Sequence, residues 1–521
     1  MSGKGLVTPG PTMKARSKVA VEDPQLQAAL SNLDLRLFTA GVVQAEHPEW
    51  KDRVAEIRRE TLADLDGWID KLEAKLLSLG VVVHRAATPE EARAYILGLA
   101  QREGVRRVVK SKSMATEEID LGSALEAVGI ESIETDLGEY IVQLADERPS
   151  HMITPAIHKT LGQIADVLSK EAGTELPVVR EPLTAWARDK LREKFVAADM
   201  GITGANFVAA DTGTIVVVTN EGNGRFCTSL PRIHVAVVPV EKVVPRFEDL
   251  GVLLPTLVMS ATGAKMSNYL SMVTGPRREG EIDGPEQLHV VLLDHNRRVL
   301  LGTPYEDMLG CIRCGACLNV CPVYRTVGGH AYDSSYSGPM GKILTPLVTG
   351  GEEGRDLPFA STLCGACTEA CPAEIPLADL LVRLRADLRT PGPVVVPGAQ
   401  KPAPPPALPV GPVGHSDEHP RKPGEGFATA VTRITVPTRR APWSQRRMGF
   451  DAWSRLWAHP SAYRASLRVG RLGAKALRPR AGWVQRAPLL RAWTDTRDVL
   501  VPSGPTFRER WAARERGEER W

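Results

Sequence analysis

The chain has 521 residues, of which 43% are hydrophobic and 24% are charged, and its formal net charge is +3. This composition is typical of a protein with buried cores, and the length predicts two or three domains. We find no apolar run long enough to cross a membrane and no apolar segment of the kind that signal peptides carry, so we expect neither a membrane-spanning protein nor an exported one.

The N-terminal part of the chain is expected to be disordered first and helical afterwards. Residues 1–24 are mostly polar and are predicted to be disordered. In residues 25–79 apolar side chains recur mostly every three or four positions, which predicts helices with one buried face. Gly80 is expected to end this region. The apolar positions are Val54, Ile57, Leu62, Leu65, Trp68, Ile69, Leu72 and Leu76.

Residues 80–298 are predicted to form an α/β domain. Short apolar runs alternate with helical segments, which favours a largely parallel sheet. The first of these helices has Thr88 as N-cap, Pro89 in its first turn and Glu91 placed to reach back. The expected strands are 81–84, 106–110, 206–210, 214–219, 233–238 and 288–293, with the third and fourth joined as a hairpin by Asp211-Thr212-Gly213.

Two cysteine runs follow in residues 299–390 and contain seven of the eight cysteines. The first run is Cys311-Ile-Arg-Cys314-Gly-Ala-Cys317-Leu-Asn-Val-Cys321-Pro322, and the second is Cys364-Gly-Ala-Cys367-Thr-Glu-Ala-Cys371-Pro372. The first matches the C-x2-C-x2-C-x3-C-P run of bacterial ferredoxins in full, and the second matches its last three cysteines. The spacing therefore predicts iron–sulfur clusters, which transfer single electrons.

In two-cluster ferredoxins the cysteine that precedes proline binds the cluster of the other run. Applied here, the rule gives Cys311, Cys314, Cys317 and Cys371 to cluster 1, and Cys321, Cys364 and Cys367 to cluster 2. Cluster 2 is then one thiolate short, and Ser361 stands at the missing position. We expect [4Fe–4S] at both sites, with cluster 2 the more labile. The alternatives at cluster 2 are Ser361 or an outside ligand on one iron, or a [3Fe–4S] cluster.

Structural zinc is the main alternative to clusters, because zinc sites of four cysteines are common. Two runs that end in Cys-Pro, with complementary numbers of cysteines, favour clusters strongly. Clustered cysteines also indicate a reducing compartment, so we expect a cytoplasmic protein. Gly315 and Gly365 each follow a predicted ligand. Two roles are open for them: residues of a tight turn, or donors of backbone N–H groups to cluster sulfurs. The eighth cysteine, Cys227, is expected to be a small buried residue.

The last part of the chain is predicted to be a linker and a basic tail. Residues 391–424 contain 11 prolines and should form an extended spacer. Residues 421–521 hold 22 Lys and Arg against 8 Asp and Glu, and seven of the ten tryptophans. We expect the tail, 425–521, to be helical or disordered. Docking to a protein partner is the first use that we expect for it, peripheral contact with the inner face of the membrane the second, and nucleic acid a distant third.

A substrate site in the α/β domain would be built from loops at strand ends. The candidates are Glu221, Asn223 and Arg225, of which Arg225 could bind a carboxylate through two N–H groups, and Lys110-Ser-Lys-Ser113, which precedes a helix and could bind an anion. We favour the alternative that these are turn and capping residues. His151 and His158 would share one helix face if helical, and we expect core or surface histidines there before a catalytic pair.

Both halves of the chain resemble known modules. The cysteine-rich part resembles the helical two-cluster ferredoxins of heterodisulfide reductase-type, anaerobic glycerol-3-phosphate dehydrogenase-type and succinate dehydrogenase-type subunits. Segments 110–121, 134–144, 151–159 and 211–225 of the α/β part resemble the lactate-utilisation (LUD) domain. Over residues 25–390 the chain resembles the LutB/LldF family of lactate-utilisation iron–sulfur proteins. The resemblance implies an α/β fold similar to NagB, RpiA and CoA transferases, followed by a mostly helical ferredoxin module.

The resemblance further implies an iron–sulfur electron-transfer subunit that acts in oxidation of L-lactate to pyruvate and passes electrons towards a quinone-linked acceptor. It implies two partners, a heterodisulfide-reductase-like cysteine-rich subunit and a second LUD-domain protein. Two alternatives remain open. The chain could be a self-sufficient 2-hydroxy-acid oxidoreductase with its substrate in the α/β domain, although no G-x-G-x-x-G dinucleotide fingerprint follows a strand. It could also be a redox-sensing scaffold.

Overall fold

The structure is a computed structural model. It describes residues 12–30, 47–264, 267, 269–351, 353–388, 483–484, 499–500 and 516. Two short strands, β11 (Trp483–Val484) and β12 (Val499–Leu500), pair antiparallel and belong to a unit of their own. The predicted linker 391–424 and nearly all of the predicted tail 425–521 lie outside the described residues. No helix in the described ranges is both long enough and apolar enough to cross a membrane.

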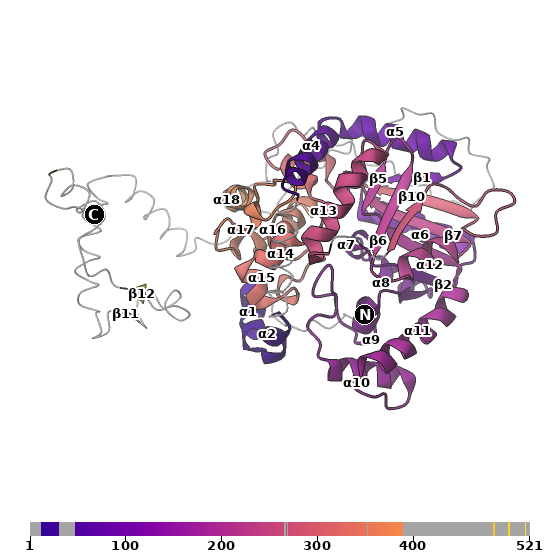
Figure 1. Ribbon diagram of the computed structural model, residues 1–521, viewed down its shortest axis with the longest axis horizontal. Coiled ribbons are helices and arrows are strands. Elements are labelled where there is room, and N and C mark those ends of the chain that lie inside the picture. The colour runs from indigo at the N-terminus through magenta and orange to yellow at the C-terminus, as the bar shows by residue number, and fades with distance from the viewer. Residues whose placement is uncertain are drawn as a thin grey trace. The chain divides into compact units, whose positions relative to one another are not determined.

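A six-stranded sheet, in which all neighbouring strands are parallel, forms the centre of the larger unit (Figure 1). Its spatial order is β1 (Val82–Ala86), β10 (Gln287–Leu293), β7 (Ile233–Pro239), β4 (Met200–Gly204), β2 (Arg107–Lys110) and β3 (Glu131–Glu134). Every residue of β7 is buried, as expected for a parallel strand covered on both faces. The parallel sheet predicted from the sequence is therefore confirmed.

Helices cover both faces of this sheet, because alternate side chains of β7 enter two separate cores. Ala236 and Val238 share a core with α5, whereas Val235 and Val237 share another with α6 and α8. The helices of this part are α4 (Glu49–Ala63), α5 (Leu65–Ser78), α6 (Pro89–Arg102), α7 (Met114–Glu118), α8 (Leu121–Ala127), α9 (Leu137–Leu144), α10 (Leu161–Ala172), α11 (Arg180–Val196), α12 (Asn223–Ser229) and α13 (Leu250–Thr262).

The predicted apolar helix face in residues 54–76 is confirmed. Six of its positions are essentially inaccessible to solvent: Val54, Ile57, Leu65, Ile69, Leu72 and Leu76. The face is shared by two helices rather than one, since α4 ends at Ala63 and the Asp64 carboxylate caps α5 by accepting from the Gly67 N–H at 3.2 Å. Gly80 follows α5 with a φ of +79°, the left-handed conformation that ends many helices.

A second, smaller sheet continues from the carboxyl ends of two central strands. Its order is β8 (Val243–Val244), β5 (Phe207–Ala209), β6 (Thr214–Thr219) and β9 (Tyr269–Val273). The predicted hairpin is confirmed, because β5 and β6 pair antiparallel. Since β5 follows β4 closely and β8 follows β7 through a 3-10 turn at Val240–Lys242, the connections 205–206 and 240–242 lie where the two sheets meet.

The expectation that residues 1–24 are disordered is wrong for residues 13–22, which form α1 (Met13–Glu22). The buried Arg16 side chain holds this helix to the cysteine-rich part, where its Nε donates to the Ala331 carbonyl at 2.9 Å. The next helix, α2 (Pro24–Leu30), packs against α15 (Pro322–Val327), as Figure 1 also shows. Residues 1–11 lie outside the description.

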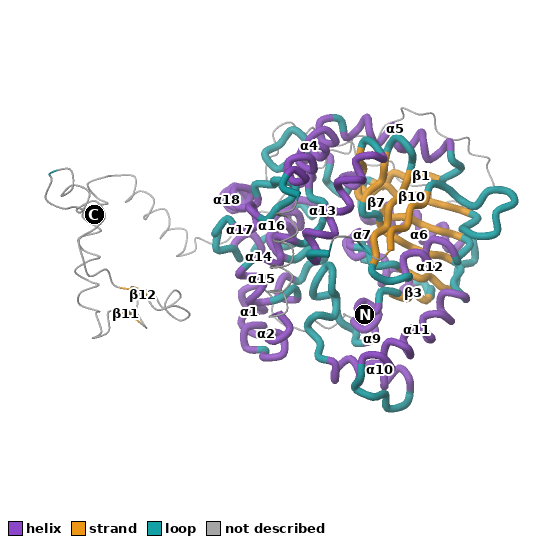
Figure 2. Tube along the Cα trace, in the orientation of Figure 1, coloured by secondary structure: helices purple, strands orange, loops and turns teal. Residues whose placement is uncertain are grey.

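The cysteine-rich module is mostly helical, as predicted. Besides α15 it contains α14 (Ala316–Val320), α16 (Gly338–Val348), α17 (Ala366–Glu369) and α18 (Leu377–Asp387). Figure 2 shows helices and loops here, and no strand is assigned to its described residues. Buried side chains of α14, α16 and α18 share one continuous core with α5 and the main sheet. The module is therefore packed firmly onto the α/β part.

Candidate cluster sites and the adjoining cavity

Four cysteines from both runs line one small cavity: Cys311, Cys314, Cys317 and Cys371. These are the four that the sequence assigns to cluster 1, and Cys371 crosses over from the second run. The other lining side chains are mainly apolar, among them Ile312, Met340, Ile375 and Leu377. The structure thus brings four soft sulfur ligands together in a largely apolar enclosure, which is the donor set that a [4Fe–4S] cluster requires.

Two left-handed residues bend the first run around this cavity. Arg313 has a φ of +61° and Gly315, the N-cap of α14, a φ of +79°. Gly365 occupies the same position before α17 with a φ of +85°. The turn role of both glycines is therefore confirmed, because the left-handed conformation favours glycine. Donation from their N–H groups to cluster sulfurs stays a prediction.

Two of the three cysteines predicted for cluster 2, Cys321 and Cys367, lie near the buried Lys342. The Lys342 ammonium donates to the Cys321 sulfur at 3.7 Å. Burial lowers the pKa of Lys342, and the nearby Cys321 and Cys367 oppose that shift. Cys364 is exposed, and the Ala366 N–H lowers the pKa of its thiol. Ser361 accepts a hydrogen bond from the Leu363 N–H at 3.2 Å, and its role as a ligand stays a prediction.

Structural zinc, the main alternative to a cluster, would need four thiolates in one tetrahedral site. Among the described residues, no three His, Cys, Asp or Glu side chains are placed to hold one metal ion. The choice between a cluster and zinc at this cavity stays a prediction from the cysteine spacing. Burial raises the pKa of Cys314, and it raises that of Cys371 to about 11. Because metal ligands must be thiolates, a metal centre bound here would have to supply the positive charge that offsets this burial.

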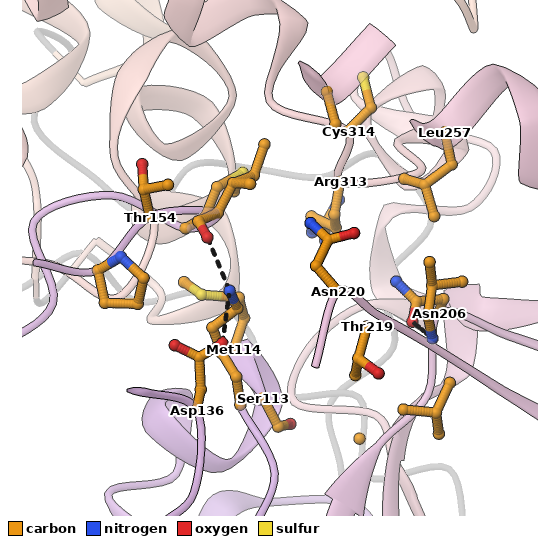
Figure 3. Close-up of a pocket in the computed structure, with 18 of the residues that line it drawn as sticks. Ser113, Met114, Asp136, Thr154, Asn206, Thr219, Asn220, Leu257, Arg313 and Cys314 are labelled. Carbon is orange, nitrogen blue, oxygen red and sulfur yellow. Dashed lines mark hydrogen bonds and ion pairs between the residues drawn. The ribbon is translucent and has the colours of Figure 1, made fainter. Parts of the chain in front are cut away.

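A larger cavity of about 560 Å³ adjoins the first. Loops at the carboxyl ends of β2, β3, β4 and β7 line it, which is where open parallel sheets bind ligands. Figure 3 shows Arg313 and Cys314 on one side of this cavity, with Ser113, Met114 and Asp136 across from them. Arg313 and Cys314 line both cavities. A single loop of the cysteine-rich module therefore separates the large cavity from the cluster 1 site.

The structure brings most of the residues predicted for a substrate site to this cavity. Of the candidates, Lys112, Ser113, Glu221 and Asn223 line it. Arg225 does not line it and its side chain is exposed on α12, so the structure does not place it as a carboxylate clamp in this cavity. Lys110 is buried elsewhere, where it pairs with Glu134 at 2.7 Å and Glu117 at 3.0 Å.

The two candidate histidines lie in a loop, so the condition under which they would share a helix face is not met. His151 accepts from the Ile153 N–H at 2.9 Å. His158 bonds to Ser150 at 2.7 Å and to Glu147, also at 2.7 Å. The contacts of both rings order the loop, as expected for structural histidines. Cys227 is likewise buried, and burial raises the pKa of its thiol to about 12.

Two titratable groups in the large cavity have pKa values near neutrality. Lys242, which the sequence did not single out, is 7% exposed, and burial lowers its pKa to about 7. Burial, with help from Asp136, raises the pKa of Glu221 to about 7. In the sequence, the signal for Lys242 is its position just after the end of a strand. Turns at such positions are usually solvent-exposed, so the lysine does not stand out.

A buried ionic network holds the cluster 1 loop to the α/β part. Arg313 pairs with one oxygen of Glu241 at 2.7 Å, and Arg297 lies 2.7 Å from the other. Arg297 also pairs with Glu118 at 2.6 Å, and the Tyr336 hydroxyl donates to the same carboxylate at 2.6 Å. Both carboxylate partners of these arginines, Glu241 and Glu118, come from distant segments of the chain, which sequence periodicity cannot reveal.

Comparisons with known proteins match both parts. A LUD domain matches residues 69–293, and a 4Fe-4S dicluster domain matches residues 307–375. Lactate utilization protein B of Oceanobacillus iheyensis is 39% identical over 97% of each chain. Its counterpart in Bacillus subtilis is 45% identical over 72% of this chain and 79% of its own.

The uncharacterized electron transport protein YkgF of Escherichia coli is 46% identical to this chain, over 71% of this chain and 79% of its own. A solved structure of a DUF162 family protein from Deinococcus radiodurans matches 44% of this chain and 98% of that chain. Its sequence identity is 14% and its TM-score is 0.26.

Proposed function

The chain belongs to the lactate utilization protein B family, and from this premise we propose that it is an iron–sulfur electron-transfer subunit in the oxidation of L-lactate to pyruvate. It accepts the electrons singly and passes them through two clusters towards a quinone-linked acceptor. The observation that carries the proposal is the single cavity lined by Cys311, Cys314, Cys317 and Cys371, which joins the two cysteine runs.

The spacing of the two sites along the chain supports an electron relay. Cys317 belongs to the cluster 1 set and Cys321 to the cluster 2 set, and α14 with its C-cap connects them. Four helical residues correspond to about 6 Å along the helix axis. Two clusters bound at these sites are therefore neighbours, as single-electron transfer between them requires.

We propose a [4Fe–4S] cluster at each site, with cluster 2 the more labile. Support comes from the difference between the two cysteine sets. Cys314, Cys317 and Cys371 are buried, whereas Cys364 is exposed and Ser361, rather than a cysteine, stands three residues before it. A [3Fe–4S] cluster at site 2 is the alternative that a missing thiolate allows.

The proposed partners are a heterodisulfide-reductase-like cysteine-rich subunit and a second LUD-domain protein. Lactate releases two electrons, and two-electron chemistry usually needs an organic cofactor such as a flavin or a nicotinamide. The sequence carries no dinucleotide fingerprint, so a partner is a reasonable source of the first electron acceptor. Seven thiols kept for metal binding suit the reducing cytoplasm, where we place the protein.

The test is an anaerobic purification of the single chain, followed by iron and sulfide analysis and EPR. We expect about eight iron atoms per chain, two reducible clusters and little lactate oxidation without partners. Lactate oxidation should appear when the proposed partners and a quinone-linked acceptor are added. Colourless protein that contains zinc or no metal would contradict the proposal.

A second candidate is a self-sufficient 2-hydroxy-acid oxidoreductase. It is favoured by the large cavity, which shares Arg313 and Cys314 with the cluster 1 site. Rapid lactate oxidation by the isolated holoprotein, with an artificial single-electron acceptor, would favour this candidate over the first.

A further inference from the structure

We propose that the large cavity binds a small carboxylate with a hydroxyl or oxo group on the adjacent carbon. The Lys242 ammonium holds the carboxylate, and Asn223 and Glu221 contact the hydroxyl or oxo oxygen. This inference rests on the proposed function for the identity of the acid, and it adds the location of a site, which that function leaves unassigned.

Lys242 is the cation of this cavity for which the described residues provide no protein partner. Lys112 pairs with Asp136 at 3.6 Å and donates to the Ile153 carbonyl at 2.9 Å. Arg313 pairs with Glu241 at 2.7 Å. For the Lys242 ammonium, the described part of the chain offers no hydrogen bond and no ion pair, although the residue is only 7% exposed. A buried unpaired charge is costly, and an anionic ligand group in the cavity removes that cost.

Asn223 provides a second, independent indication of a ligand. It is 5% exposed, and neither its amide nitrogen nor its amide oxygen has a hydrogen-bond partner among the described residues. Leaving a buried donor and a buried acceptor unpaired destabilises a protein, so a bound polar molecule is expected there. An amide can donate to an oxo oxygen or accept from a hydroxyl, which suits both members of a 2-hydroxy and 2-oxo acid pair.

Glu221 adds a carboxyl group beside this amide. It accepts from the Leu137 N–H at 3.2 Å, and the Thr219 hydroxyl donates to its carbonyl at 2.7 Å. The turn that carries Glu221 and Asn223 needs glycine at position 224, because a Cβ there would lie 2.8 Å from Thr219 Cγ2. The local sequence therefore closes a tight turn after β6 and presents both side chains to the cavity.

The volume of the cavity sets the range of acids that it can take. A three-carbon acid displaces only three or four waters, on the order of 100 Å³. The cavity measures about 560 Å³, and apolar side chains such as Met114, Ile157 and Leu257 form part of its wall. The site should therefore accept 2-hydroxy and 2-oxo acids with side chains longer than a methyl group.

The experiment is anaerobic titration calorimetry of the holoprotein with L-lactate, pyruvate, a longer 2-oxo acid and acetate. We expect binding of the first three and weaker binding of acetate, which lacks the second oxygen group. Lys242→Gln should weaken pyruvate binding about tenfold or more, and Lys242→Arg should restore most of it. Arg225→Gln is the matched control, because it removes an exposed cation outside the cavity and should leave the affinity unchanged.

EPR of the reduced holoprotein gives an independent readout, since a ligand beside Cys314 should shift the cluster 1 signal and leave cluster 2 unchanged. The inference is overturned if the wild-type holoprotein binds none of the acids at millimolar concentration. It is also overturned if acetate binds as tightly as pyruvate, or if a folded Lys242→Gln variant retains full affinity.

Iron content and reduction by dithionite, measured on the same samples, separate this inference from the proposed function. Samples with two reducible clusters and no acid binding would overturn the inference alone. Acid binding by samples that cannot take up clusters would support the inference and contradict the electron-transfer function.

Discussion

The Arg313 guanidinium donates to the Glu241 carboxylate at 2.7 Å, which fixes the loop between Cys311 and Cys314 to the end of β7. Both side chains are almost completely buried. The loop that carries the proposed cluster 1 ligands is therefore positioned partly by the α/β part of the chain. If this loop binds a cluster as proposed, the ion pair should contribute both to the stability of the fold and to the assembly of cluster 1.

Replacement of Arg313 by Met should destabilise the protein by about 3 kcal/mol, because it leaves a buried carboxylate short of one partner. The matched control is Arg277→Met, which removes a more exposed pair with Glu286 and should cost about 1 kcal/mol or less. Denaturant unfolding of both variants, with iron content, checks the prediction. Equal losses of stability in the two variants would contradict it.

The crossed assignment of Cys371 predicts which cluster each substitution removes. Cys371→Ser should abolish the EPR signal of cluster 1 and spare cluster 2, although Cys371 belongs to the second run. Cys367→Ser should have the opposite effect. Each variant should retain about half of the wild-type iron. Loss of the same signal in both variants would show that the ligands do not cross.

Ser361→Cys should make cluster 2 more resistant to air, because a thiolate is a softer and stronger ligand for iron than a hydroxyl oxygen. Ser361→Ala serves as the control and should leave cluster 2 as labile as in the wild type or more so. The measurement is the [3Fe–4S] EPR signal that develops during timed exposure to air. A faster appearance of that signal in Ser361→Cys would argue against a ligand position at residue 361.

Acid binding in the large cavity should weaken as the pH rises through about 7. Burial lowers the pKa of Lys242 to about 7, with Arg313 and Arg58 acting in the same direction and Glu241 and Cys311 opposing them. The ammonium is therefore present below this pH and is lost above it. Glu221, with a pKa raised to about 7, becomes negative in the same range and repels the ligand.

The pH profile of pyruvate affinity checks this prediction by calorimetry. Lys242→Arg should decline less steeply with pH, since arginine stays protonated. A double variant that also contains Glu221→Gln should be nearly independent of pH. An affinity that rises with pH in the wild type would refute the assignment.

Gly201→Ala should destabilise the fold by about 3 kcal/mol, because an added Cβ would lie 1.9 Å from the Cys227 carbonyl oxygen of α12. The control is Gly98→Ala within α6, where the nearest atom is the flexible end of Arg102 at 3.4 Å. That change should stabilise the protein by about 0.5–1 kcal/mol through helix propensity. Thermal or denaturant unfolding of the two holoprotein variants distinguishes these opposite effects.

Short-range patterns were sufficient to predict much of this fold. The alternation of strands and helices predicted the parallel sheet. The three- and four-residue spacing of apolar side chains predicted the buried face of α4 and α5. The cysteine spacing predicted the group of four around one cavity, because ligand motifs are encoded by local chain geometry. Each of these features depends on residues close together in the sequence, or on a motif in which the rule for which cysteine binds which cluster is known.

Long-range contacts account for what the sequence did not reveal. The polar N-terminal segment folds as α1 because Arg16 reaches carbonyl groups more than three hundred residues away. The sequence leaves Lys110 open as a candidate for anion binding, whereas in the fold it pairs with Glu117 and Glu134. Lys242 follows a strand in what would usually be a solvent-exposed turn, yet tertiary packing buries it.

Because the two cavities share a wall, binding of an anion in the large cavity and reduction of a cluster in the small one should affect each other equally. Because Arg313 and Cys314 face both spaces, a negative charge added on either side raises the energy of one added on the other. An electron arriving at the metal centre should loosen an anion in the neighbouring chamber, and that anion should by the same amount make the electron harder to accept. Release of the bound acid and reduction of the cluster are thus governed by the same coupling free energy.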